Sequence, residues 1–229
     1  MTMDRYAACH VLYQKGIPAT CWFEDAVAHH GVPTARFDLF LLVEDMDTAA
    51  QVLLHDGWAS AATRPNDKYA FYGDENCKPY RRMERPGLPG KHTFLLNAAD
   101  WAFPVERLGK VDEMEGARLE VNGPPFFPSL PHLVDALIDS ILDSKESNKT
   151  VDRLIVMLAY LYGYVKEMKK PSFAEQLAYD HRQFHYDTEA ITEYSLRFFA
   201  HERKVRQQIR DGTLVPYHDP WHNDRECLS

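Results

Sequence analysis

Residues 36–43, with the sequence RFDLFLLV, constrain the fold more than any other part of the chain. Alternate side chains of a strand point to opposite faces of a sheet. From Phe37 to Val43 both faces are apolar, and the one exception is Asp38. A short apolar run of this kind, rich in branched and aromatic residues, predicts a strand buried on both sides.

A helix is predicted on each side of this strand. Pro18 suits the first turn of a helix over 18–31, in which apolar residues recur at helical spacing until Gly31 ends it. Asp45 or Asp47 can cap a second helix, and Gly57 can supply the left-handed turn after it. The predicted unit is helix, buried strand, helix.

Asp38 needs a reason to be in such a strand. An ionised carboxylate in an apolar environment costs several kcal/mol unless a cation, a metal or good donors compensate it. We therefore consider Asp38 a candidate catalytic residue and metal ligand. The structural alternative is a pair with an arginine such as Arg36 or Arg182.

Residues 17–58 resemble the core of the polymerase-β-like nucleotidyltransferases, and fungal nucleotidyltransferase-like proteins in particular. The resemblance lies in a helix, the sequence GVPT at 31–34, a strand with Asp38, and a helix that ends in Gly57-Trp58. It implies a transferase, with ATP and Mg²⁺ as cofactors. The family places a glycine-rich turn before the helix and a second carboxylate two residues after the first. This chain has WFED at 22–25 and Phe40 at those places.

The rest of the first 123 residues predicts further strands. We expect short strands in the loop-rich segment 59–90, best at 69–72, and clear strands at 92–96 and 118–122. With the Asp38 strand they would form a small mixed or antiparallel sheet. Glu120 would supply a carboxylate from a neighbouring strand, and Asp100 is the rival candidate.

The remaining residues predict a helical bundle. The proline-rich segment after Gly123 suggests a boundary between a nucleotidyltransferase-like lobe, 1–123, and a bundle lobe, 124–229, packed tightly on it. We expect four helices: 130–142 capped by Ser129, an apolar central helix capped by Thr150, then 172–186 and 188–210. The fold class is α+β: a small sheet with flanking helices, followed by a C-terminal helical bundle.

The candidate site residues fall into two groups. Carboxylates crowded together favour a metal or a cationic substrate, so the acidic residues predict an acidic pocket. Two histidines four residues apart on a helix can act as acid and base or bind a metal, although one of them can also be a core residue bonded to a carbonyl or to Asp180. The catalytic candidates are Asp38, Glu24, Asp25, Glu120, His181 and His185, and the substrate-binding candidates are Trp22, Phe40, Arg182, Arg81 and Arg82.

Composition narrows the partners and the compartment. A formal charge of -8 argues against nonspecific attraction to nucleic acid or an anionic membrane. The basic residues of 197–210 predict a solvated helix face, with contact to tRNA as the alternative. The four widely spaced cysteines suit a reducing, cytoplasmic environment, and no segment is apolar enough to span a membrane. The histidines and aspartates of 218–224 could bind a metal, but a terminal extension is the simpler interpretation.

Three functional hypotheses follow. The first is an intracellular transferase that acts on a small molecule through an acidic pocket. The second is a tRNA-dependent amide-forming enzyme, such as an arginine-containing cyclodipeptide synthase, in which acidic residues hold a guanidinium. The third is a catalytically inactive nucleotide-binding or adaptor module in which Phe40 marks the lost metal site.

Overall fold

A computed structural model of the chain describes residues 4–61, 78–85, 91–109, 126–144, 149–190 and 195–217. Several predictions from the sequence lie outside these ranges. They are the strands at 69–72 and 118–122, the carboxylate of Glu120, the lobe boundary after Gly123 and the candidate metal ligands of 218–224.

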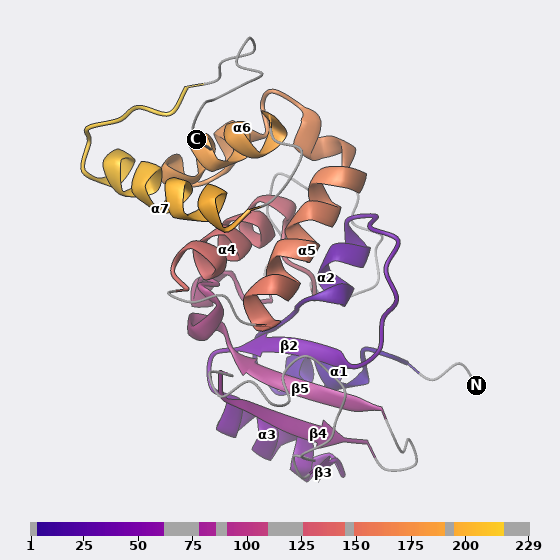
Figure 1. The fold of residues 1–229 in the computed structure, drawn as a ribbon. Helices are drawn as coiled ribbons and strands as arrows, with labels where there is room; N and C mark the ends of the chain where they lie inside the picture. The colour runs from indigo at the N-terminus through magenta and orange to yellow at the C-terminus, as the bar shows by residue number, and fades with distance from the viewer. Residues whose placement is uncertain are drawn as a thin grey trace.

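A five-stranded mixed sheet forms one end of the described part of the molecule (Figure 1). The two central strands, β2 and β5, run parallel, and the other neighbours are antiparallel. This arrangement confirms the predicted mixed sheet and the strand at 92–96. In spatial order the strands are β1 (Ala19–Cys21), β2 (Leu39–Val43), β5 (His92–Asn97), β4 (Tyr80–Glu84) and β3 (Ala59–Ser60).

The side chains of β2 alternate between two hydrophobic cores, as its sequence predicts. Leu39 and Leu41 pack with α1 (Ala7–Gln14) and α3 (Met46–His55) on one face of the sheet. Phe40 and Leu42 enter a larger core on the other face, which continues into the helical region as far as Phe199. Burial on both faces explains why all five residues of β2 are apolar.

Helices from the second half of the chain, together with α2, cover the second face of the sheet (Figure 1). Short 3-10 helices connect several of them. No helix in the described part of the chain is long and apolar enough to cross a membrane. In chain order the elements are α2 (Glu24–His29), η1 (Ala98–Trp101), η2 (Val105–Arg107), α4 (Leu130–Leu142), α5 (Lys149–Tyr164), η4 (Lys166–Lys169), η5 (Ala174–Gln176), η6 (Tyr179–His181), α6 (Arg182–Ala190) and α7 (Leu196–Arg210).

The helix predicted over 18–31 is wrong in its first half. Residues 19–21 form β1, whose Ala19 lies opposite Val43 of β2, and only the six residues of α2 are helical. A three-residue strand is too short to show a period of two, and its formation depends on pairing with β2. Phe23 turns the chain between β1 and α2 with φ 52, in the left-handed region that favours glycine.

The predicted strand at 36–43 begins only at Leu39. Phe37 is 53% exposed, and Asp38 stands one residue before the strand, at its buried amino end. The basic segment KPYRRMER, in contrast, contains a strand, β4, that its composition does not suggest. Its pairing with β5 stabilises this strand.

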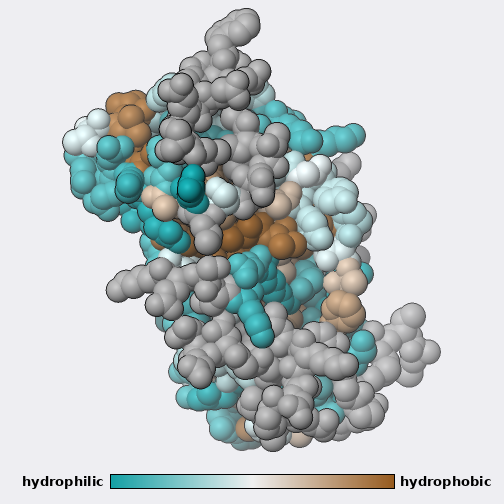
Figure 2. Space-filling view, in the orientation of Figure 1, coloured by the Kyte–Doolittle hydropathy of each residue, from teal (hydrophilic) through white to brown (hydrophobic). Residues whose placement is uncertain are grey.

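The helical region also differs in detail. We predicted α5 as a central helix, but Val156, Tyr160 and Tyr164 are exposed on its outer side. Figure 2 shows an apolar band across the middle of this face, over α5. The helix predicted at 172–186 is divided into η5, η6 and the start of α6, and α6 runs on to Ala190, past the start predicted for the fourth helix.

The helix caps test the local predictions. The side chain of Asp45 accepts hydrogen bonds from the backbone N–H groups of Asp47 and Thr48, as predicted, and Gly57 has φ 85. Ser129 precedes α4, but its hydroxyl bonds His132 instead of the backbone. Thr150 lies inside the first turn of α5, so the prediction that it caps this helix is wrong.

Candidate functional site

Asp38 is buried at the amino end of β2, where it meets the start of β5. Its Oδ1 accepts a hydrogen bond from the backbone N–H of His92 at 3.1 Å and lies 3.5 Å from Nδ1 of the His92 ring. The predicted arginine partners lie elsewhere, because Arg36 donates to the hydroxyl of Tyr6 and Arg182 donates to the carbonyl of Glu175. The partner of Asp38 is therefore His92.

Asp25 is almost fully buried and paired with Arg5. The Nε and Nη2 atoms of Arg5 donate to its two carboxylate oxygens at 2.7 and 2.5 Å, and the hydroxyl of Tyr6 donates to Oδ1 at 3.1 Å. Burial and the charge of Asp25 raise the pKa of Tyr6 to about 12. Arg5 also donates to the carbonyls of Phe37 and Asp38, so this ion pair ties α2 to the approach of β2.

Glu24 pairs with Arg153 from α5. Nη2 of Arg153 lies 2.5 and 2.6 Å from the two carboxylate oxygens of Glu24. The same guanidinium lies over the rings of Phe23 and Phe40, 4.2 and 4.9 Å from their centroids. The Arg153 guanidinium is thus held between a carboxylate and two aromatic rings.

Because of these pairings, the described carboxylates of the predicted acidic pocket do not share one cavity. Glu24, Asp25 and Asp38 each have a separate partner, and none of the three lines either of the two cavities described below. Trp22 and Phe40, predicted to bind substrate, are buried in the larger core. Sequence patterns locate buried carboxylates, but their partners come from distant segments of the chain.

His181 belongs to an ion-pair network between α4, η6 and α7. Its Nδ1 lies 2.7 Å from Oδ1 of Asp135 and its Nε2 lies 3.0 Å from Oδ1 of Asp139. Burial alone would lower the pKa of His181, but the two carboxylates outweigh it and raise the pKa to about 9. Both ring nitrogens are engaged, which leaves neither for a metal. The predicted alternative partner, Asp180, instead accepts from Arg210.

His185 lies four residues after His181, in α6, and has different neighbours. Its Nδ1 lies 2.9 Å from the hydroxyl of Tyr162, and its Nε2 lies 3.8 Å from a carboxylate oxygen of Glu189. The two histidines of the predicted pair therefore contact separate sets of groups.

The predicted substrate-binding arginines also lie apart. Arg81 donates to the carboxylate of Asp47 at the surface, and Arg82 reaches the ring of His92. Arg182 lies over the ring of Tyr179. The structure does not bring these three guanidinium groups together around one ligand.

The larger of the two cavities lies at the carboxyl end of β5, where η1 meets α4 and α5. Its volume is about 380 Å³, and we call it the Asp100 pocket. The charged and hydroxyl side chains on its walls are Lys78, Asp100, Asp139, Ser140, Asp143, Ser144 and Thr150. Of these, the sequence suggested only Asp100, as a rival to Glu120.

Three polar groups of the Asp100 pocket could contact a ligand: the Lys78 amine, the Asp100 carboxylate and the Thr150 hydroxyl. Lys78 lies with its amine 4.8 Å from the ring centroid of Trp101, and burial lowers the pKa of that amine. In the described part of the chain, Asp100 has no hydrogen-bond or ion-pair partner, and the buried hydroxyl of Thr150 has no hydrogen-bond partner. A buried hydroxyl without a partner is costly, so a ligand or a water is expected there.

Asp139 and Asp143 close the pocket on the side of α7. Arg206 binds both carboxylates, and Arg203 donates to the carbonyls of Leu142 and Ser144 at the end of α4. The sequence could have suggested this network, because the three aspartates of α4 are spaced by four and share one side of the helix. The solvated face predicted for the arginines of α7 is wrong for Arg203 and Arg206.

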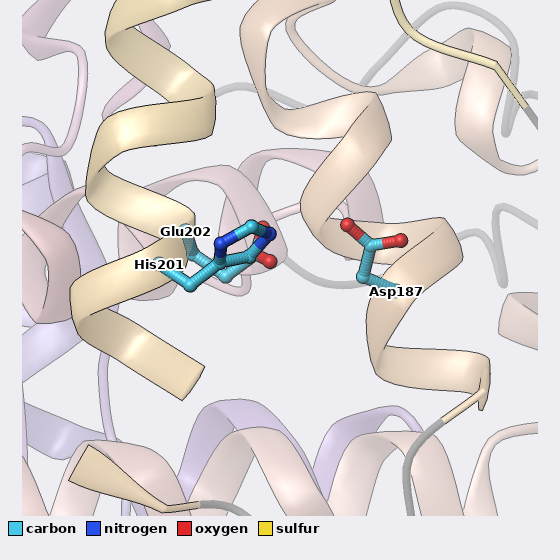
Figure 3. Close-up of side chains that lie close together, drawn as sticks. All are labelled: Asp187, His201 and Glu202. Carbon is cyan, nitrogen blue, oxygen red and sulfur yellow. The ribbon is translucent and has the colours of Figure 1, made fainter. Parts of the chain in front are cut away.

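A second group of side chains has the donor atoms that a metal ion needs. Asp187 of α6 and His201 and Glu202 of α7 point toward one another (Figure 3). Each offers one donor atom, and these atoms lie within 4.8 Å of one another. Residue spacing does not reveal this group, because two helices contribute to it.

Comparison with known proteins gives only distant similarity. Neither a protein-family model nor a curated protein sequence matches the chain. Among solved structures, JHP933 from Helicobacter pylori is similar at 11% sequence identity, over 91% of each chain, with a TM-score of 0.38. A proposed nucleotidyltransferase from H. pylori is similar at 11% identity, over 91% of this chain and 94% of that chain, with a TM-score of 0.41. Similarity at these TM-scores is too low to support an argument about function.

Proposed function

We propose that the protein is a transferase that acts on a small, amine-bearing molecule bound in the Asp100 pocket. The observation that carries this proposal is a pair of groups on the walls of a cavity of about 380 Å³: the carboxylate of Asp100, which has no hydrogen-bond or ion-pair partner among the described residues, and the buried hydroxyl of Thr150, which no described residue bonds. Cavities of this size with a few polar groups are typical of small-molecule sites. The class of reaction comes from the resemblance of residues 17–58 to the nucleotidyltransferases.

Charge explains the preference for an amine. Asp139 and Asp143 are already bound by Arg206, whereas Asp100 faces Lys78 through space and has no ion pair in the described ranges. A ligand ammonium or guanidinium can therefore pair with Asp100 without breaking an existing bond. Burial lowers the pKa of the Lys78 amine, so a larger fraction of it is neutral than of an exposed lysine, and this neutral form can accept a proton from the substrate.

The ATP and Mg²⁺ that the resemblance implies do not fit the residues near Asp38. Two bound magnesium ions need more than one carboxylate. Here Phe40 stands in place of the second carboxylate, and the guanidinium of Arg153, which would repel a cation, lies over its ring. The proposed reaction therefore includes no magnesium-dependent step at Asp38. We also propose a cytoplasmic location, supported by two buried cysteines, Cys9 and Cys21, which form no disulfide although their hydrogen-bonded thiols have sulfurs 4.0 Å apart.

Calorimetric titration with arginine, agmatine and spermidine tests the binding step. We expect at least one of these amines to bind, and Asp100→Asn to weaken that binding about 10-fold, the value of one charge-assisted hydrogen bond. Asp56→Asn, a change of an exposed aspartate after α3, is the matched control and should bind as the wild type does. Failure of all three amines, or equal affinity in Asp100→Asn, contradicts the proposal.

Mass spectrometry of an expression host tests the reaction. A transferase should cause a new small molecule to accumulate, and Asp100→Asn should abolish it while Asp56→Asn does not. If the host with wild-type protein matches the host with empty vector even when the three amines are supplied, the proposed activity is wrong.

A further inference from the structure

A second cavity of about 200 Å³ lies at the opposite end of the central strands from the Asp100 pocket. It is built where β2 and β5 begin and β4 ends, with the start of the chain and Trp58 closing it. Its wall includes Arg5, Arg85, Lys91 and His92, with Asp4 as the single carboxylate. This composition is unusual for a protein with a formal charge of -8.

Two cations of this cavity have no carboxylate partner in the part of the chain that the structure describes. Within the described ranges, neither the guanidinium of Arg85 nor the amine of Lys91 has a carboxylate within ion-pair distance. Glu84 of β4 lies opposite His92 of β5, so Arg85 and Lys91 occupy the next positions at the same end of the two antiparallel strands. Asp4, the one acid of the wall, lies 3.3 Å from His10. Two positive charges are therefore available to an anion.

The same cavity exposes aromatic surface. Phe37 is 53% exposed, and Trp58 is partly exposed with the guanidinium of Arg85 6.0 Å from its ring centroid. An aromatic ring of a ligand can pack on these side chains, as bases stack on aromatic residues in nucleotide sites.

Two side chains that line the cavity, Arg5 and His92, are fixed by hydrogen bonds to other residues. Arg5 is fixed by Asp25 and by the carbonyls of Phe37 and Asp38, and His92 is fixed by Asp38 and Arg82. Side chains that are already ordered lose little entropy when a ligand binds. The buried Asp38, the residue that the sequence singled out, thus supports one wall of this cavity through His92.

We propose that this cavity binds a small anion joined to an aromatic ring, of the size of a nucleoside monophosphate or smaller. Arg85 and Lys91 bind the phosphate, and Phe37 and Trp58 contact the ring. The site is separate from the Asp100 pocket and does not depend on the transferase activity proposed there.

Titration calorimetry with AMP, adenosine and inorganic phosphate tests the proposal on the full chain. We expect AMP to bind at least 10-fold more tightly than either adenosine or phosphate, because only AMP supplies both the ring and the charge. Binding should weaken as salt is added, since exposed charges are screened. Equal affinity for AMP and phosphate, or no binding of AMP at millimolar concentration, overturns the proposal.

Variants locate the binding. Lys91→Ala and Arg85→Ala should each weaken AMP binding by about 10-fold or more, whereas Lys204→Ala, a change of an exposed lysine on α7, should not. Trp58→Phe should keep most of the affinity and Trp58→Ala should lose it. Asp100→Asn should bind AMP as the wild type does, which separates this site from the transferase site. Unchanged binding in the double variant Arg85→Ala, Lys91→Ala contradicts the assignment.

Discussion

Some buried polar side chains of this protein are hydrogen-bonded and others are not. The carboxylate of Asp25, which is 1% exposed, receives two bonds from Arg5 and one from Tyr6. The hydroxyl of Thr150 is also buried, yet no described residue bonds it. A buried polar group without a partner has a free-energy cost, which a bound ligand or water would offset. The hydroxyl of Thr150 should therefore lower the stability of the folded protein while it serves ligand binding.

The change Thr150→Val tests this expectation. Replacing a buried, unbonded hydroxyl by a methyl group of similar shape removes a desolvation cost, so we expect the free energy of unfolding to rise by about 1 kcal/mol. Urea denaturation followed by circular dichroism measures it. The matched control is Thr48→Val, which should destabilise the protein because the Thr48 hydroxyl donates to Asp45 at the cap of α3. A loss of stability in Thr150→Val would show that its hydroxyl does have a favourable partner.

Ion pairs between helices hold the elements of the helical region together. The carboxylates of Asp135 and Asp139 on α4, and of Asp143 just after it, face His181 at the end of η6 and the arginines of α7. These charges come from three elements and meet on one side of α4, which explains why Arg203 and Arg206 do not lie on a solvated face of α7. The imidazole at the centre of the network makes it sensitive to pH.

Stability should fall in alkaline solution because of His181. Its pKa is about 9 in the folded protein against 6.5 for an unperturbed histidine, so the protonated form stabilises the fold. This stabilisation is complete below pH 6.5 and is lost as the pH rises through 9. Such a pKa difference corresponds to about 3 kcal/mol.

Urea denaturation of the wild type and of His181→Gln between pH 6 and pH 10 measures this effect. The loss with rising pH should be much smaller in the variant. His55→Gln, a change at the exposed end of α3, should keep the dependence of the wild type. Parallel curves for the wild type and His181→Gln would mean that the imidazole is not charged in the folded state.

The whole molecule is organised by the sheet, which separates a smaller core from a larger one. The larger core joins Phe40 and Phe94 of the sheet to α4, α5 and Phe199 of α7 without interruption. A sheet face covered in this way cannot be exposed to water without a large loss of hydrophobic free energy. The two predicted lobes, 1–123 and 124–229, should therefore not behave as independent domains.

We expect one cooperative unfolding transition for the full chain. Far-ultraviolet circular dichroism is dominated by the helical region, whereas near-ultraviolet circular dichroism reports on Trp22 and Trp101 in the core beside the sheet. The two signals should change at the same urea concentration. Two separate midpoints would show that the sheet and the helical region unfold independently.

The sequence alone determined the features that depend on neighbouring residues. The strand at 92–96, the α3 cap at Asp45, the turn at Gly57 and the apolar stripe of α4 follow from short-range patterns, and the structure has all four. Hydrogen bonds of caps and turns span only a few residues. Such features require no knowledge of the rest of the fold.

Only the tertiary structure decided the pairing of distant segments. β1 and β4 form because β2 and β5 offer them hydrogen-bonding partners, although the composition of each segment favours another structure. In the same way, Asp38 is hydrogen-bonded to His92, 54 residues away. Asp100 and Thr150, which are also distant in the sequence, line the same cavity. The free energy of a buried charge depends on which groups surround it in space. That arrangement is a property of the packed chain and cannot be inferred from residue spacing.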